Sequence, residues 1–156
     1  MTENLIIRQG SREEIYEALL PQLEALTAGE TDAVANMANV VAALKQTFGF
    51  FWVGFYVVRG DVLTLAPFQG PVACTRIGRG KGVCGAAWDA GRTIIIDDVE
   101  LFPGHIACNS ASRSEIVVPL VKAGRVTGVL DVDSDSPAAF DHIDAAWLER
   151  IVALLV

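Results

Sequence analysis

The chain has 156 residues, 52% of them apolar, and a net charge of −7. This length favours a single domain over residues 1–156, large enough to bury a core without disulfide or metal cross-links. The acidic balance and the scattered arginines and lysines argue against a nucleic-acid partner. No apolar run reaches the ~18 residues of a membrane span, and the N-terminus has no signal-peptide pattern, so we expect a cytoplasmic protein with no membrane partner.

The first third of the chain is typical of two helices. Ser11 followed by Glu14 has the form of a capping box. Gly29 then breaks the helical pattern, and Thr31 is the expected cap of a second helix that extends to Phe48. The apolar positions at helical spacing are Ile15, Leu19, Leu23 and Leu26 in the first helix and Val34, Met37, Val40, Val41 and Leu44 in the second.

After Gly49 the pattern becomes that of strands joined by short turns. We expect strands over 50–58, 62–66, 93–97, 115–121 and 126–133, the last two forming a hairpin. A glycine-rich loop over 78–82 is not a P-loop, because Lys81 precedes a glycine, and we expect no long helix after it. A final helix begins near Asp141. The order of these elements along the chain, helices followed by strands and a final helix, favours an α+β fold with a mainly antiparallel sheet and helices on one face.

Three carboxylates are placed to converge on one face of this sheet. Asp131 and Asp133 are two apart on a strand and share a face, while Leu130 and Val132 point toward the helices. Glu115 begins the neighbouring strand, so hairpin pairing brings it close to both. This face is either solvated or lines a pocket, in which case it suits an ammonium ligand, a hard metal ion or a proton donor.

Two aromatic residues are also candidates to line this pocket. Trp52 and Tyr56 share one face of the first strand, and Phe51, Val53, Phe55 and Val57 occupy the other. Each ring has a polar tip that needs a partner, which suits a small polar ligand, although packing under a loop explains the pattern equally well.

The three cysteines, Cys74, Cys84 and Cys108, differ in their surroundings. Cys84 lies among small apolar residues, as a buried free cysteine does. Cys108 lies in a polar loop and is the best candidate nucleophile, with Arg76, His105 and Arg113 as cations able to favour its thiolate. A zinc site that uses His105 and Cys108 is the competing hypothesis, weakened by the lack of a CxxC pair.

Several motifs of this chain resemble the free methionine-(R)-sulfoxide reductases, which are stand-alone GAF-fold enzymes. The matching segments are Trp52-Val-Gly-Phe-Tyr56, Gln69-Gly-Pro-Val-Ala-Cys74-Thr-Arg-Ile, Gly80-Lys-Gly-Val-Cys84-Gly, Phe102-Pro-Gly-His-Ile-Ala-Cys108, Ser114-Glu-Ile-Val-Val-Pro-Leu120 and Val129-Leu-Asp131-Val-Asp133-Ser. The resemblance extends from about residue 12 to residue 150. It implies a single GAF-like domain with about six strands, helices on one face and a ligand pocket on the other.

The resemblance also implies an activity and residue roles. It implies reduction of free methionine-(R)-sulfoxide with thioredoxin as external reductant and no bound cofactor or metal. Cys108 resembles the attacking cysteine, Cys74 its resolving partner and Cys84 a third thiol that acts in recycling. The matching pocket residues are the acids Glu115, Asp131 and Asp133, of which Glu115 or Asp133 is the expected proton donor, and the aromatics Trp52 and Tyr56. One departure is Asn109, where the family pattern has aspartate.

Three further hypotheses stay open at this point. A non-catalytic GAF module that binds a small molecule has the same fold without redox chemistry. A zinc-stabilised interaction domain is a second alternative to the enzyme. A homodimer formed through the N-terminal helices rests on fold analogy alone.

Overall fold

The computed structural model describes residues 4–156. It contains four α-helices and six strands among these residues, joined by short turns and two 3₁₀ turns. In chain order they are α1 (Arg12–Thr27), α2 (Ala33–Phe48), β1 (Trp52–Arg59), β2 (Val62–Gln69), β3 (Arg76–Gly78), α3 (Gly82–Ala90), β4 (Ile94–Ile96), η1 (Val99–Leu101), β5 (Ser114–Lys122), β6 (Arg125–Ser134), α4 (His142–Val152) and η2 (Ala153–Leu155).

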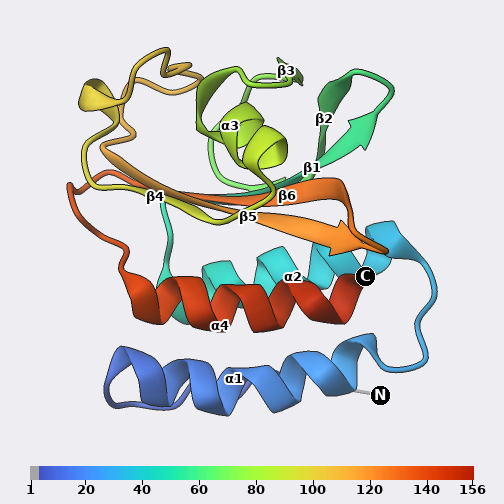
Figure 1. Cartoon of the computed structure of the whole chain (residues 1–156). Helices are drawn as coiled ribbons and strands as arrows, with labels where there is room; N and C mark the ends of the chain where they lie inside the picture. Colours follow the sequence, from blue (N-terminus) through green and yellow to red (C-terminus); the bar gives the residue numbers. More distant parts are fainter. Residues whose placement is uncertain (1–3) are drawn as a thin grey trace.

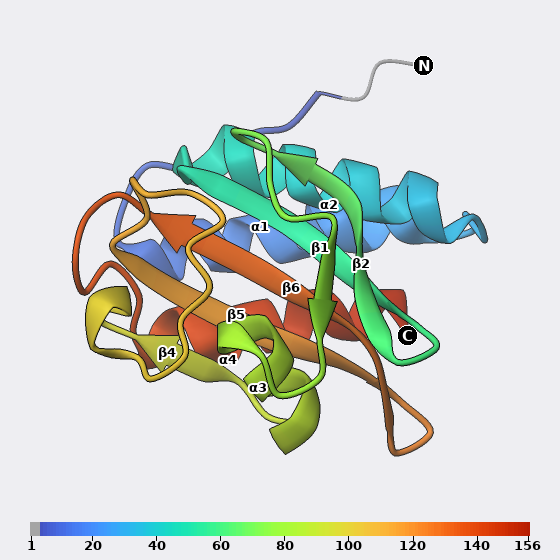
Figure 2. The same cartoon turned by 90° about the horizontal axis from the view of Figure 1, so that it is seen from above.

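The strands form one antiparallel sheet in the order β3-β2-β1-β6-β5-β4, which confirms the expected α+β class. Helices α2 and α4 pack side by side on one face, and α1 lies beneath them as an outer layer (Figure 1). Helix α3 and the long segment between η1 and β5 cover the opposite face, which Figure 2 shows from above. The sheet therefore separates a helical core from a face covered mainly by loops.

The two N-terminal helices form as the pattern predicts, with one correction. Ser11 and Glu14 make both hydrogen bonds of a capping box at the start of α1. The cap of α2 is Asp32, whose carboxylate accepts the Ala35 N–H, so the prediction of Thr31 is wrong. A carboxylate favours this position because it also interacts with the positive end of the helix dipole. Val34 is 61% exposed and lies outside the buried stripe.

Strand alternation divides the apolar side chains between two cores. Val53, Phe55, Leu130 and Val132 lie in the core under the helices. Trp52, Tyr56 and other side chains of the opposite face form a second cluster with Cys84 and the apolar residues of α3. Phe51 precedes β1 and packs against this second cluster, contrary to the expected alternation. The division confirms that the Trp52 face is distinct from the helical core.

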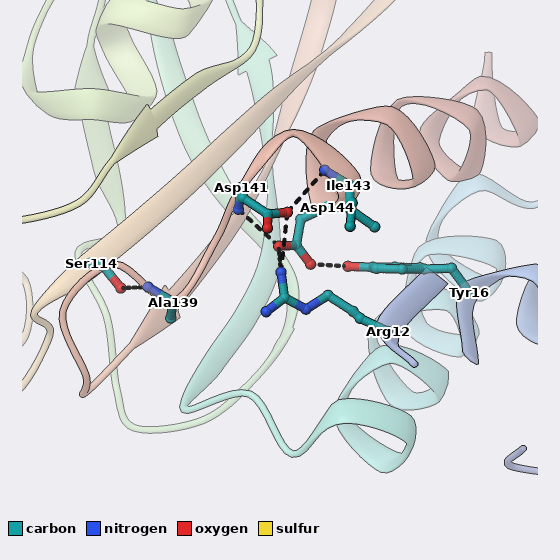
Figure 3. Close-up of polar contacts among 7 residues, drawn as sticks. All are labelled: Arg12, Tyr16, Ser114, Ala139, Asp141, Ile143 and Asp144. Carbon is teal, nitrogen blue, oxygen red and sulfur yellow. Dashed lines mark hydrogen bonds and ion pairs between the residues drawn. The ribbon is translucent and has the colours of Figure 1, made fainter. Parts of the chain in front are cut away.

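A buried polar cluster joins α1 to α4 beneath the sheet (Figure 3). The Tyr16 hydroxyl donates to Asp144 Oδ1 at 2.7 Å, and Arg12 Nη1 lies 2.8 Å from Asp144 Oδ2. The same Oδ2 accepts the Asp141 N–H, which completes a capping box for α4. Asp144 is 1% exposed, and these contacts satisfy its charge.

The sequence analysis missed two elements, the short strand β3 and helix α3. Helix α3 begins at Gly82, directly after the glycine-rich loop, and is short. A Cβ atom at Gly85 would lie 2.5 Å from the Gly78 carbonyl oxygen, so only glycine lets the helix approach β3 this closely. Across residues 4–156, no helix is long and apolar enough to cross a membrane.

Candidate active site

Three carboxylates converge on the loop-covered face of the sheet, as their strand positions predict. Glu115 on β5 pairs directly with Asp133 on β6, and Asp131 follows two residues away on the same face. Glu115 and Asp131 are each 6% exposed, whereas Asp133 is partly exposed. The three acids therefore line a pocket, and the hypothesis of a solvated face does not hold.

The acids perturb one another because the pocket isolates them from water. Burial, followed by repulsion from Asp131, raises the pKa of both Glu115 and Asp133 well above the ordinary carboxylate range. Burial also raises the pKa of Asp131, although hydrogen bonds with Glu115 and Cys84 act in the opposite direction. Asp131 Oδ1 is buried and has no hydrogen-bond partner within the described part of the chain. The cluster therefore favours a shared proton or a bound positive charge.

Cys74 and Cys108 are joined by a disulfide above this pocket, with their Cα atoms 5.4 Å apart. Cys108 lies in the segment over 102–113, which crosses the loop-covered face (Figure 2). The Cys108 sulfur is therefore bonded to Cys74, so the competing hypothesis of a zinc site that uses His105 and Cys108 loses its cysteine ligand in this disulfide-bonded form. Asn109 makes a local turn here, because its side-chain oxygen accepts the Ala111 N–H at 2.8 Å. An aspartate would make the same bond.

The aromatic residues hold the segment that contains Cys74. Trp52 Nε1–H donates to the Pro71 carbonyl oxygen at 3.0 Å, and the Tyr56 hydroxyl donates to the Cys74 carbonyl oxygen at 2.9 Å. The two rings stack with centroids 6.0 Å apart. Their polar tips therefore bind backbone carbonyls, while their ring faces line the pocket. A Cβ atom at Gly54 would lie 2.6 Å from the Trp52 ring, so this glycine leaves room for it.

Cys84 lies on the first turn of α3 and is a free thiol, 4% exposed, as its apolar neighbours predict. Its sulfur is 4.0 Å from Glu115 Oε2. Burial, followed by the charges of Asp131 and Glu115, raises the pKa of this thiol well above its ordinary value. In this environment Cys84 is held in the protonated form.

Two basic residues also line the pocket, and sequence reasoning assigned neither of them to it. His105 Nε2 lies 3.9 Å from Glu115 Oε1, and burial lowers its pKa. Lys81 precedes α3 at the pocket rim. Arg76 and Arg113, expected near Cys108, are exposed and do not line the pocket. The short spacing between His105 and Cys108 could have indicated that His105 lies in the pocket, because both residues lie on the segment that covers the acids.

The cavity beneath the disulfide is small. Its volume is about 40 Å³, room for a few water molecules. Pockets that hold small-molecule ligands usually measure about 300–1,000 Å³. The pocket over the acidic cluster is therefore narrow in the disulfide-bonded protein, and we expect the covering segment to move when a ligand the size of an amino acid binds.

The comparisons with known proteins agree with this geometry. The family model described as "GAF domain" matches residues 27–156. The "GAF domain-containing protein A" of Dictyostelium discoideum is 60% identical over 99% of each chain. The "Free methionine-R-sulfoxide reductase" of Escherichia coli is 44% identical over 93% of this chain and 88% of its own.

A solved structure gives the same result. The free methionine-R-sulfoxide reductase from Neisseria meningitidis, in complex with its substrate, superposes with a TM-score of 0.97. It is 52% identical and covers 99% of this chain and 93% of its own. The chain belongs to the GAF-domain family and is closely related to the free methionine-R-sulfoxide reductases.

Proposed function

We propose that this protein is a free methionine-(R)-sulfoxide reductase. The observation that carries the proposal is the Cys74–Cys108 disulfide lying over a pocket of three carboxylates. A module that only binds a small molecule has no need of a disulfide at the entrance of its pocket. The relationship to reductases from Escherichia coli and Neisseria meningitidis supports the same activity and its preference for the R diastereomer.

The two cysteines divide the reaction between them. Cys108 attacks the sulfoxide sulfur, the substrate S–O bond breaks as its oxygen passes to the cysteine sulfur, and methionine leaves while Cys108 becomes a sulfenic acid. The Cys74 thiol then condenses with the sulfenic acid, which forms the disulfide and releases water. A dithiol reductant of the thioredoxin type opens the disulfide by exchange and restores both thiols. Each cycle thus oxidises one dithiol and reduces one sulfoxide.

The carboxylates hold the substrate. The ammonium group of a free amino acid supplies the positive charge that Glu115, Asp131 and Asp133 lack, and its N–H groups reach the unpartnered Asp131 oxygen. A methionine inside a peptide has no such charge and would leave buried acids unpaired, which is costly. The acidic cluster therefore selects the free amino acid over the peptide-bound form.

Proton delivery falls to a carboxyl group of this cluster. The sulfoxide oxygen leaves only when it is protonated or strongly hydrogen-bonded, and a general acid works best when its pKa lies near the operating pH. Burial and neighbouring charge raise the pKa of Glu115 and Asp133 in this direction. We assign the proton to one of these two residues, and the Trp52 ring seats the methyl group on sulfur.

The test is chromatography of methionine formed from the separated sulfoxide diastereomers with dithiothreitol as reductant. We expect methionine from the free R form alone. In a single turnover, Cys108→Ser should form none, whereas Cys74→Ser should form about one equivalent but lose cycling with thioredoxin. Equal activity on both diastereomers, or single-turnover product from Cys108→Ser, would contradict the proposal.

Thioredoxin as the natural reductant and the role of Cys84 as a third thiol in recycling are part of this proposal. A cytoplasmic location, a homodimer and a single domain over the whole chain stay predictions from the sequence.

A further inference from the structure

Cys84 is a nucleophilic group that takes no part in the Cys74–Cys108 disulfide. It remains a free thiol while Cys74 and Cys108 are paired. Cys84 Sγ, a Glu115 carboxylate oxygen and an Asp131 carboxylate oxygen all lie within 4.8 Å of one another, and all three residues are buried. Three potential metal ligands from α3, β5 and β6 therefore meet at one point in the pocket.

The unpartnered Asp131 oxygen, which also serves the proposed ammonium group, indicates that this point accepts a cation. Asp131 Oδ1 has no hydrogen-bond partner in residues 4–156, although Asp131 is only 6% exposed. A buried carboxylate oxygen without a donor is unfavourable, and a bound positive charge relieves it. No arginine or lysine side chain forms an ion pair with Glu115, Asp131 or Asp133 within the described chain. His105 lies beyond the group, near the other Glu115 oxygen.

The donor set distinguishes which cations fit. An ammonium group needs only the carboxylates and gains nothing from a thiol. A thiolate beside two carboxylates instead suits a borderline-soft divalent ion such as zinc, which takes sulfur at about 2.3 Å and carboxylate oxygen at about 2.0–2.2 Å. These bonds place ligands about 3.5 Å apart. The 4.0 Å between Cys84 Sγ and Glu115 Oε2 is about half an ångström longer than this, and all three ligand atoms lie within 4.8 Å of one another, so small side-chain shifts bring them into range.

The small volume of the pocket also favours a metal ion over an amino acid. Its volume of about 40 Å³ accommodates one ion with a water molecule as fourth ligand, but not an amino acid. The ligands come from a helix and two central strands, so the site does not depend on the segment over 102–113.

We propose that Cys84, Glu115 and Asp131 form a site for a thiophilic divalent cation of the zinc class, and that this ion and a substrate ammonium group exclude each other. Binding releases the Cys84 proton to solvent and forms a metal–thiolate bond without any change of oxidation state. The exclusion follows because both cations use Glu115 and Asp131. This second clause rests on the proposed reductase function, whereas the metal site itself does not.

The experiment uses the disulfide-bonded protein, in which Cys84 is the one free thiol of the chain. Titration with Co²⁺ should give the near-ultraviolet thiolate-to-cobalt absorption and the visible bands of a tetrahedral ion, and Zn²⁺ should bind once per chain by calorimetry. Cys84→Ser should lose the thiolate band. Asp131→Asn, which keeps the thiol, should weaken binding at least about 10–100-fold. His142→Ala, an exposed histidine far from the pocket, is the matched control and should bind as the wild type does.

A thiolate band that survives in Cys84→Ser, or no Co²⁺ and Zn²⁺ binding by folded wild-type protein, would overturn the metal site. Circular dichroism of each variant separates loss of ligand from loss of fold.

Exclusion is tested on the Cys74→Ser/Cys108→Ser double variant, whose pocket is not closed by a disulfide. Methionine sulfoxide should raise the apparent Kd for Co²⁺ in proportion to its concentration. An unchanged Kd would overturn the exclusion. Because this readout is binding alone, and methionine formation is measured without metal, failure of the site and failure of the reductase assignment give different results.

Discussion

Two buried acidic regions lie on opposite faces of the same sheet, and their surroundings are opposite in kind. Asp144, on the helical face, is fully partnered by the Tyr16 hydroxyl, the Arg12 guanidinium and a backbone N–H (Figure 3). Asp131, on the pocket face, has one oxygen without a partner and two further carboxylates as neighbours. A satisfied buried acid joins structural elements, whereas an unsatisfied one is ready to bind a cation.

The largest expected effect comes from the unsatisfied acid. Asp131→Asn should lower kcat/KM for free methionine sulfoxide by about 100-fold or more, because the ammonium group loses its buried charged partner. The free energy of unfolding should stay the same or rise, since the change removes one of three repelling carboxylates. Asp135→Asn, an exposed acid just after the same strand, is the control. A marked loss of stability in Asp131→Asn would mean that this acid is structural after all.

Substitution of the satisfied acid, Asp144, should lower stability and leave activity unchanged. Asp144→Ala leaves the Tyr16 hydroxyl buried without an acceptor and frees the Arg12 side chain. We expect the free energy of unfolding in urea to fall by about 1–3 kcal/mol. The kcat of the remaining folded protein should be unchanged. If kcat fell together with stability, the two faces would be coupled more tightly than the comparison allows.

The pH dependence of stability sharpens the contrast. The ordinary pKa of a glutamate such as Glu115 is 4.5, and burial raises the pKa of Glu115 in the folded protein. Above about pH 4 the folded state therefore binds more protons than the unfolded state. Its contribution to stability is complete below that pH and is lost as pH rises through the folded pKa. The free energy of unfolding of the wild type, less that of Glu115→Gln, should therefore fall as the pH rises. A difference that rises with pH would contradict the assigned direction of the shift.

The smallest effects should come from the two tyrosine hydroxyls. Tyr16→Phe removes a bond to Asp144, and Tyr56→Phe removes a bond to the Cys74 carbonyl. Each should lower the free energy of unfolding by about 0.5–1.5 kcal/mol. Only Tyr56→Phe should also slow disulfide formation between Cys74 and Cys108, measured by stopped-flow after a single turnover. Equal rates in both variants would show that this hydroxyl does not position the Cys74 segment.

The alternation of the strands, and therefore the face that holds the acids, could be predicted from the sequence. Glu115, Asp131 and Asp133 could be placed together because side chains of a strand alternate with a period of two and a short hairpin sets its register. The capping box of α1 was also readable, since its two partners are three residues apart. These features depend on local chemistry alone.

The surroundings of those acids, in contrast, depend on how distant segments of the chain pack. Helix α3 was missed because two of its nine residues, Gly82 and Gly85, are glycine and because it follows a glycine-rich loop. Packing on β3 and the sheet, not propensity, stabilises it. The positions of Cys84 and His105 beside Glu115 depend on this long-range packing. Whether a carboxylate on a strand is solvated or buried is set by the segments that fold over it, and these lie far away in the chain.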